Sequence, residues 1–467
     1  MTTWGASLQS LTREADAAKA AGRLAEAIDL YARAAQSFPA SAVAEHNLAG
    51  ALGDAARYPE AEARCRAAFA KGLDAPETWL VLGRALQGQR RLDEAEAAFR
   101  EAIGRRPAMA EAHRDLAQLI WMRTEDIAEA TALLDRAIGT EPGHPVLRLV
   151  KAKALEYAGD PLGAYAVLSE AVKGGGDPVL EAMSADAAVR IGEPQAGLAH
   201  AERAAALAPD DPLVLTIFAQ ACLAARQPAR AAQAMEALRA RAPFDQHVLA
   251  LLATAWRMLD DPRYRALYDY GAFVGIYRLA APAGWPDLDA YLADLAAAAA
   301  GAHAYRAHPF DQSLRQGSQA PNILDLDDPA IRAFPAAMAE AVAEHLRRLG
   351  RGEDPVRMRN TGRWAFQGAW SVRLRPHGFH ADHVHSQGWL SSACYLSLPP
   401  AVEGPERQGW LKFGQPGVAT DPPLGPEHFV KPEPGLLALF PSYMWHGTVP
   451  FGGTEPRLTI AFDLVPA

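Results

Sequence analysis

Three histidines and one arginine near the C-terminal end of this sequence have the types and spacing of a metal site beside an anion-binding group. His383 and His385 are two positions apart. Side chains alternate along a β-strand, so both imidazoles would point to one face. His446 comes later in the chain, and Arg457 lies eleven positions beyond it. Three side chains on one face of an iron(II) ion leave positions open for oxygen chemistry, and a guanidinium can hold an acidic co-substrate.

The same stretch offers a second pair of metal ligands. Four histidines and Asp382 fall close together, which isolated core or surface histidines do not explain. His380 and Asp382 have the His-x-Asp spacing of the common site made of two histidines and one carboxylate. The first ligands are therefore His383 with His385, or His380 with Asp382, or a mixture of the two pairs. A site of three histidines lacks a negative ligand and would leave the metal more electron-poor.

Length and composition limit the class of protein. The chain has 467 residues, half of them apolar, so we expect a globular protein of two or three domains. The net charge of -9, without a basic stripe of interleaved aromatic residues, argues against nucleic-acid binding. Three widely spaced cysteines, no evident signal peptide and no apolar run of membrane-span length predict a cytoplasmic protein without a membrane segment.

Small and apolar residues recur through the N-terminal half at a spacing of 34 residues. Pro209 and Pro243 are that far apart, and each ends a helical run. Ala95 and Phe99 have counterparts at the same offsets before the closing proline of other units. The pattern resembles the tetratricopeptide repeat, in which small residues let two helices pack closely and a proline ends the second. We expect about seven such units across residues 8–245, stacked as an α-solenoid.

Stacked repeats of this kind present a concave surface that commonly takes extended peptides. We therefore expect a peptide or protein partner, and the alternative is that the array only dimerises the chain or spaces the next domain. Residues 245–275 are expected to cap the array with a final helical pair, so the first domain is predicted to be 1–275. Neither the ligand nor the oligomeric state can be read from the sequence.

The pattern changes from helical to strand-like after about residue 354. Short β-rich runs separated by proline and glycine clusters cover residues 366–374, 389–398, 410–413, 436–440 and 458–464. Such a series predicts a double-sheet jelly roll, the double-stranded β-helix of cupin-like barrels. Helical runs at 287–302 and 328–348 come before it. The second domain is therefore predicted to be 276–467, a jelly roll with leading helices.

Several segments of this second domain resemble a bacterial and phage family of 2-oxoglutarate/Fe(II)-dependent oxygenases. The segment from His383 to Tyr395 is similar to the family's His-x-His pair and the strand that follows it. Residues 434–450 resemble its glycine-led strand, Phe-Pro-Ser turn and distal histidine, and residues 457–463 resemble its closing arginine-led strand. A segment that precedes the barrel in these proteins is matched by residues 309–319.

Three positions depart from the family pattern. Ser392 replaces the usual glycine, Cys394 replaces an aromatic residue, and Asp463 stands where asparagine is common. None of these changes removes a candidate ligand.

The resemblance implies Fe(II) as cofactor, with 2-oxoglutarate and O2 as co-substrates. His383, His385 and His446 would be the metal ligands and catalytic residues, because the register relative to Tyr395 favours the His383–His385 pair. Arg457 would grip the distal carboxylate of 2-oxoglutarate in two parallel hydrogen bonds.

The cofactor-binding set implied by the resemblance also contains Tyr395 and Thr459. Thr459 follows Arg457 by two positions on the same strand, so it faces the same side and could add a hydroxyl donor. The alternatives are that Arg457 forms an ordinary salt bridge and that Thr459 is only a strand residue.

Together these features predict a 2-oxoglutarate- and Fe(II)-dependent dioxygenase that hydroxylates a peptide or protein recruited by the repeats. One alternative is a non-catalytic adaptor with a degenerate metal-binding barrel. Another is an oxygenase that acts on a small molecule and uses the repeats for assembly. The sequence does not distinguish hydroxylation from desaturation or cyclisation, and it does not identify the oxidised atom.

Overall fold

The computed structural model describes residues 7–467 of the chain. The opening residues 1–6, which bear on the expectation of no signal peptide, lie outside the described part. The chain divides into two compact units, unit 1 at Met1–Ala158 and unit 2 at Gly159–Ala467. Within the described residues, none of the helices has both the length and the apolarity needed to cross a membrane.

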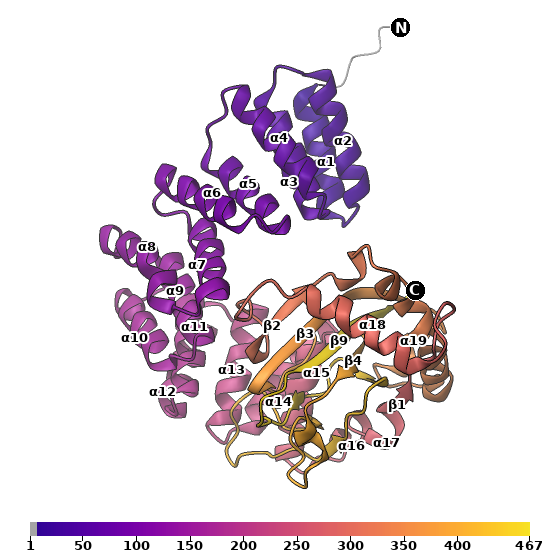
Figure 1. Ribbon diagram of the computed structural model, residues 1–467. Coiled ribbons are helices and arrows are strands. Elements are labelled where there is room, and N and C mark those ends of the chain that lie inside the picture. The colour runs from indigo at the N-terminus through magenta and orange to yellow at the C-terminus, as the bar shows by residue number, and fades with distance from the viewer. Residues whose placement is uncertain (1–6) are drawn as a thin grey trace, which may run out of the picture. The chain divides into compact units, whose positions relative to one another are not determined.

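The described part of unit 1 is built from helices (Figure 1). They are α1 (Leu8–Ala20), α2 (Leu24–Ser37), α3 (Ala42–Asp54), α4 (Tyr58–Ala70), α5 (Pro76–Gly88), α6 (Leu92–Arg105), α7 (Ala110–Thr124), α8 (Ile127–Thr140) and α9 (Pro145–Tyr157). Consecutive helices pack against each other, and each pair packs on the next. This is the arrangement predicted from the 34-residue spacing.

Close helix contacts explain the small residues of the repeat. Gly83 of α5 faces Phe99 of α6, and a Cβ added at Gly83 would lie only 2.5 Å from the Phe99 ring. Ala95 and Phe99 are both completely buried at this contact. A larger residue at position 83 would therefore force the two helices of the pair apart.

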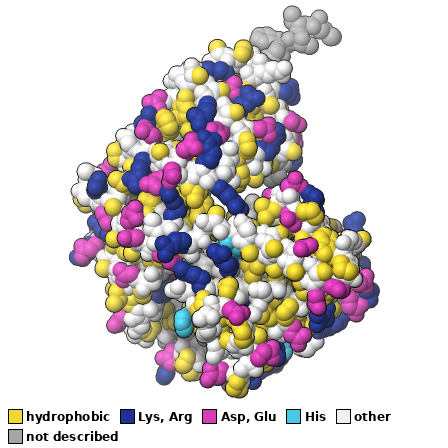
Figure 2. All heavy atoms as spheres, viewed as in Figure 1, with side chains coloured by type: hydrophobic (Ala, Val, Ile, Leu, Met, Phe, Trp, Pro, Cys, Tyr) yellow, Lys and Arg dark blue, Asp and Glu magenta, His cyan; other side chains and the backbone are white. Residues whose placement is uncertain are grey.

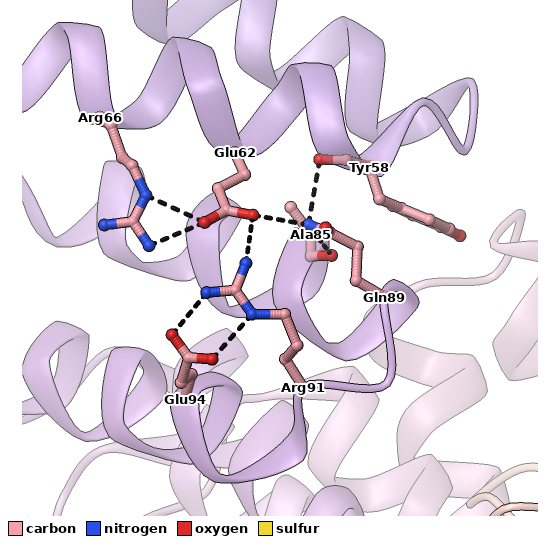
Figure 3. A network of polar contacts seen from close by, with 7 residues as sticks. All are labelled: Tyr58, Glu62, Arg66, Ala85, Gln89, Arg91 and Glu94. Atoms are coloured by element: carbon pink, nitrogen blue, oxygen red, sulfur yellow. Dashed lines mark hydrogen bonds and ion pairs between the residues drawn. The ribbon is translucent and has the colours of Figure 1, made fainter.

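Charged side chains of both signs are intermixed over the helices of unit 1 (Figure 2). One ion-pair network joins adjacent helix pairs (Figure 3). Glu62 of α4 has a side chain that is only 12% exposed, and it accepts hydrogen bonds from Arg66, Gln89 and Arg91. Arg91 also forms a two-pronged contact with Glu94. The donors compensate the buried carboxylate and tie α4 to the next pair.

Unit 2 begins with further helices of the array. These are α10 (Pro161–Ala171), the 3-10 turn η1 (Val172–Gly174), α11 (Pro178–Arg190), α12 (Pro194–Leu207), α13 (Pro212–Ala224), α14 (Pro228–Arg241), α15 (Gln246–Met258), α16 (Arg263–Leu267) and α17 (Tyr270–Phe273). Asp177, Asp211 and Asp245 start α11, α13 and α15, because each side chain accepts a hydrogen bond from a free N–H of the first turn.

The remainder of unit 2 contains two antiparallel sheets. The larger sheet has the order β1-β7-β4-β9-β3-β2, and the smaller has the order β6-β5-β8. The strands are β1 (Gly275–Arg278), β2 (Leu314–Pro321), β3 (Trp364–His380), β4 (Leu390–Ser397), β5 (Leu411–Phe413), β6 (His428–Val430), β7 (Leu436–Pro441), β8 (His446–Thr448) and β9 (Arg457–Pro466). The helical elements of this part are α18 (Leu288–Gly301), η2 (Ile323–Asp325), α19 (Pro329–Leu349), η3 (Arg357–Arg359) and η4 (Pro400–Glu403).

The larger sheet has two differently covered faces. Helices α18 and α19 cover one face, where Phe334 of α19 meets Phe462 of β9 (Figure 1). The smaller sheet faces the other, where the rings of Phe413 and Phe440 are 4.9 Å apart. The interior lies between the sheets, so the predicted solenoid followed by a jelly-roll-like sandwich is confirmed.

The end of the helical array is hydrogen-bonded to the β-sandwich within unit 2. The Tyr268 hydroxyl donates to the Tyr443 carbonyl and accepts from Trp445 N, each at 3.0 Å. The indole of Trp445 donates to Thr254 of α15 at 2.9 Å. Helices α10–α17 thus belong to the same compact unit as the strands. Strand β1 begins at Gly275. The domain boundary predicted between residues 275 and 276 stays a prediction.

Candidate metal centre

The main chain brings the two distant histidine segments together. His383 and His446 form an antiparallel bridge, with hydrogen bonds of 2.9 and 3.1 Å between their backbone groups. His385 N donates to the carbonyl of Ser442 at 3.0 Å. These bonds fix the segment that follows β3 against β8 and the turn before it. They therefore set the relative positions of all three predicted ligands.

The three imidazoles converge. His383, His385 and His446 each offer a ring nitrogen, and these atoms all lie within 4.8 Å of one another. The Nε2 atoms of His383 and His385 are 3.0 Å apart. For a metal–imidazole bond of about 2.1 Å, two ligands at a right angle also lie about 3.0 Å apart. The spacing of this pair therefore suits two adjacent positions of an octahedral ion.

Hydrogen bonds at Nδ1 determine which ring nitrogen is free. Nδ1 of His383 lies 2.8 Å from the carbonyl of Ala381, and Nδ1 of His446 lies 2.9 Å from that of Met444. Nδ1 of His385 lies 2.6 Å from Oδ1 of Asp463. Each partner is an acceptor, so Nδ1 carries the proton and Nε2 presents a lone pair. Facing lone pairs 3.0 Å apart call for a cation between them, so the donor set fits a metal.

Burial keeps these rings in the form that binds metal. Burial, assisted by the neighbouring His385, lowers the pKa of His383 to about 3. Burial and the charge of His383 hold the pKa of His446 well below its ordinary value. Both imidazoles are therefore neutral at physiological pH, as metal coordination requires.

The alternative pair, His380 and Asp382, lies beside this group. Oδ2 of Asp382 is ion-paired with Lys412 at 2.8 Å, and neither residue belongs to the convergent set of ligand atoms. Nδ1 of His380 is 3.0 Å from the hydroxyl of Ser313, which also lies 3.2 Å from Nε2 of His383. The structure thus brings His383, His385 and His446 together and gives Asp382 a cationic partner of its own.

Arg457 points into the interior between the sheets. It is 2% exposed, and its guanidinium lies over the ring of Tyr395 at 4.9 Å. Its NH1 is 3.5 Å from the hydroxyl of Thr448, two residues after His446. Among the residues that the structure describes, no carboxylate pairs with Arg457, and Nε has no hydrogen-bond partner. The predicted alternative of an ordinary salt bridge is therefore wrong.

The two other predicted cofactor-binding residues share this interior face. Tyr395 and Thr459 are paired across β4 and β9. The Tyr395 hydroxyl is buried, and within the described chain it has no hydrogen-bond partner. The Thr459 hydroxyl lies 3.5 Å from the carbonyl of Val372. A buried cation and a free hydroxyl together can receive a carboxylate.

Solvent reaches the interior face near the imidazoles. Ala393 and Ala461 belong to the central strands β4 and β9, and yet both keep partial exposure. Ala461 pairs with Trp370, whose ring centroid is 5.5 Å from that of His385. Two small side chains therefore leave the metal-binding side of the interior open to a bound molecule.

Sequence reasoning missed several groups at the centre. Asp463, Ser391 and Thr448 were not predicted to act here. Asp463 could have been found from the alternation of β9, because every second residue from Arg457 faces the interior. Thr448 lies two positions after His446 on β8, so the same alternation places it on the same face.

Models of two known families match separate stretches of the chain. The family model described as "Putative 2OG-Fe(II) oxygenase" matches residues 368–463. A tetratricopeptide-repeat model matches residues 46–103 and 80–145. Residues 46–145 of this chain are therefore similar to tetratricopeptide repeats, and residues 368–463 are similar to 2OG-Fe(II) oxygenases. Among curated proteins, no relative matches the chain.

Solved structures similar to this chain include several repeat proteins. A tetratricopeptide repeat protein from Parabacteroides merdae is 16% identical over 54% of this chain and 99% of its own, with a TM-score of 0.37. One from Thermus thermophilus is 19% identical over 46% of this chain and 100% of its own, with a TM-score of 0.28. The first repeat domain of Spaghetti, bound to an HSP90 peptide, is 23% identical over 24% and 89%, with a TM-score of 0.23.

Proposed function

We propose that this protein is a 2-oxoglutarate- and Fe(II)-dependent hydroxylase whose substrate is a peptide or protein held by the helical repeats. The observation that carries the proposal is the buried, unpaired guanidinium of Arg457 in the same interior as three convergent Nε2 lone pairs. A buried cation without an anionic partner is costly, so a bound anion is expected to compensate it.

Different residues would bind the metal and the co-substrate. His383, His385 and His446 would hold Fe(II) through Nε2, and Arg457 with the Tyr395 hydroxyl would hold the distal carboxylate of 2-oxoglutarate. When bound, these groups would supply activation of O2, with one oxygen atom going to a substrate C–H bond and the other to succinate, with release of CO2.

The hydrocarbon walls of the site complete this arrangement. Phe440 lies against His446, with ring centroids 4.6 Å apart, and excludes water from one side. The open positions at Ala393 and Ala461 admit substrate from the other.

A peptide substrate is favoured by the loop between β5 and β6. Its Asp421 pairs with Arg226 after α13, at 2.6 Å. Its Gly417 lies against the segment that carries the ligands, because a Cβ there would approach the Asp382 carbonyl within 1.9 Å. A hollow beside the loop is lined by residues of α11 and α13, including Gln220, and by Val418. One surface thus connects the repeat helices of unit 2 with the ligand segment.

The test of the oxygenase is anaerobic titration of the full chain with Fe(II) and 2-oxoglutarate, followed by admission of air. We expect a weak visible charge-transfer band and then succinate. Arg457→Met should abolish the band at limiting 2-oxoglutarate while metal binding is kept. Arg373→Met is a matched control, because Arg373 pairs with Leu458 and so lies on the opposite face of the sheet. Metal binding without band or succinate would contradict the proposal.

The test of the substrate class uses a peptide library and mass spectrometry. We expect certain peptides to gain one oxygen atom in a reaction that requires 2-oxoglutarate. Gln220→Ala and Val418→Ala should reduce this reaction at limiting peptide and leave the anaerobic band unchanged. Turnover of small molecules alone, unaffected by either substitution, would contradict a peptide substrate.

A further inference from the structure

One imidazole of the metal centre has a charged partner, and the other two do not. Nδ1 of His383 and of His446 donates to main-chain carbonyls, whereas Nδ1 of His385 donates to the Asp463 side chain at 2.6 Å. We propose that Asp463 is a positioning residue that acts on the metal through His385, an inference that rests on the proposed function. It holds the ring with Nε2 toward the ion and supplies the negative charge that three neutral imidazoles lack.

Asp463 is buried without a cation of its own. Its side chain is 9% exposed, and that of His385 is 13% exposed. Within the described part of the chain, its side-chain contacts are with His385 and Ser391, and no lysine or arginine pairs with it. A buried carboxylate requires a compensating positive charge. An ion on the far nitrogen of His385 provides that charge, as in other carboxylate–histidine–metal arrangements.

Two serines fix the direction of the carboxylate. Ser391 donates to Oδ1 of Asp463 at 2.7 Å. A hydroxyl has one proton, so Ser442 must donate to Ser391 across the 2.8 Å that separates them. The carbonyl of Ser442 also accepts from His385 N at 3.0 Å. The ring and the main chain of His385 are therefore held by one connected set of residues.

The side chains around Asp463 and Ser442 are tightly packed. A Cβ added at Gly388 would lie 2.3 Å from the Ser442 hydroxyl and 3.3 Å from Cγ of Asp463. Because His385 and Asp463 cannot move apart freely, the charge of the carboxylate acts on the imidazole at a fixed distance. Such a partner raises the basicity of the ligand and favours the oxidised metal.

Asp463→Asn is the decisive variant, because the amide keeps the size and an acceptor oxygen while it removes the charge. In the full chain we expect it to weaken Co(II) binding by about 10- to 100-fold, measured by anaerobic titration of the visible Co(II) absorption. The Fe(III)/Fe(II) midpoint potential should rise. The free energy of unfolding of the metal-free protein should stay the same or increase, because a buried charge has gone.

Ser392→Ala is the matched control. Ser392 is buried on β4 directly after Ser391, but its hydroxyl bonds to the main chain of Phe462 on the opposite face. It should lower stability and leave Co(II) affinity unchanged. The inference is overturned if Asp463→Asn binds Co(II) as tightly as wild type. It is also overturned if weaker binding only follows a loss of metal-free stability. A wild-type chain that binds no Co(II) would instead overturn the proposed function on which the inference rests.

Discussion

Removal of one hydroxyl from the helical array should weaken a metal site that the hydroxyl does not touch. Tyr268 is buried, and its hydroxyl bridges the carbonyl of Tyr443 and the N–H of Trp445, directly before His446. In Tyr268→Phe both main-chain groups lose this partner in a place that water does not reach. A buried polar group left unsatisfied costs about 1–3 kcal/mol, so the variant, with two such groups, should lose about 2–6 kcal/mol of unfolding free energy.

Part of that loss should appear as mobility of residues 442–445, the ligand turn, which leads directly into His446. If about 1.4 kcal/mol of it falls on the ligand turn, the metal binds about tenfold more weakly. The assay is urea unfolding of the metal-free chain together with anaerobic Co(II) titration. Tyr291→Phe is the control, because Tyr291 is also fully buried but donates a single hydrogen bond to Ala330, in the helical layer. It should lose about 1 kcal/mol and keep its Co(II) affinity.

Equal destabilisation of the two variants, or unchanged Co(II) affinity in Tyr268→Phe, would refute the reasoning. Either result would mean that the helices after the repeats do not hold the ligand turn.

Three further outcomes are expected. Burial lowers the pKa of His345 to about 3, so its contribution to stability is complete above about pH 6.5 and is lost as the pH falls toward 3, at about 1.4 kcal/mol per pH unit. Between pH 6.5 and 4.5, the unfolding free energy of His345→Leu, measured with urea, should fall with pH less steeply than that of the wild type by about 1.4 kcal/mol per pH unit. An identical pH dependence of the two proteins would contradict this prediction. Glu62→Gln should lower the unfolding free energy of unit 1 by about 1–2 kcal/mol, because the exposed arginine partners can be rehydrated. Glu94→Gln, at an exposed position, should lower it by less than about 0.5 kcal/mol. Equal losses in the two variants would argue against the network. Co(II) at a hundredfold excess over its dissociation constant should raise the unfolding free energy by about 2.7 kcal/mol, and His446→Ala should abolish the rise.

The parts of the fold that follow a local period could be predicted. The helical pairs were predicted because Ala95 and Phe99 have counterparts at fixed offsets in other units of the sequence. The strand that begins at Arg457 was predicted for the same kind of reason, since alternating residues face the interior. Each of these features is encoded within a few neighbouring residues. The convergence of His383 and His385 was expected from the same alternation, but both residues lie between β3 and β4, where hydrogen bonds to His446 and Ser442 position them.

The parts that depend on local irregularity were missed. Strand β2 was not predicted, because Gln316 has a positive φ of 57° and the register with β3 shifts between Arg315 and Gly317. That bulge interrupts the alternation by which a strand is identified. Strand β8, His446–Thr448, is too short to show any period. Its place beside β5 is set by the chain around it.

Contacts between residues far apart in the chain could not be predicted from the sequence. Tyr268 and Trp445 are 177 positions apart, and their hydrogen bond follows from the docking of the array on the sandwich. The charge of Asp463 became meaningful only when His385 was found 2.6 Å away. The sequence contains both residues but does not show that they are in contact.

The boundary at Ala158 has a consequence for how such proteins can diversify. The hydrogen bonds that hold the turn before His446 come from α15 and from Tyr268, and all of these residues lie in unit 2. Gain, loss or exchange of the repeats before Ala158 would leave these hydrogen bonds in place. Recombination between α15 and the first strand would separate the turn from its support, so viable chimaeras should have their crossovers upstream of that helix.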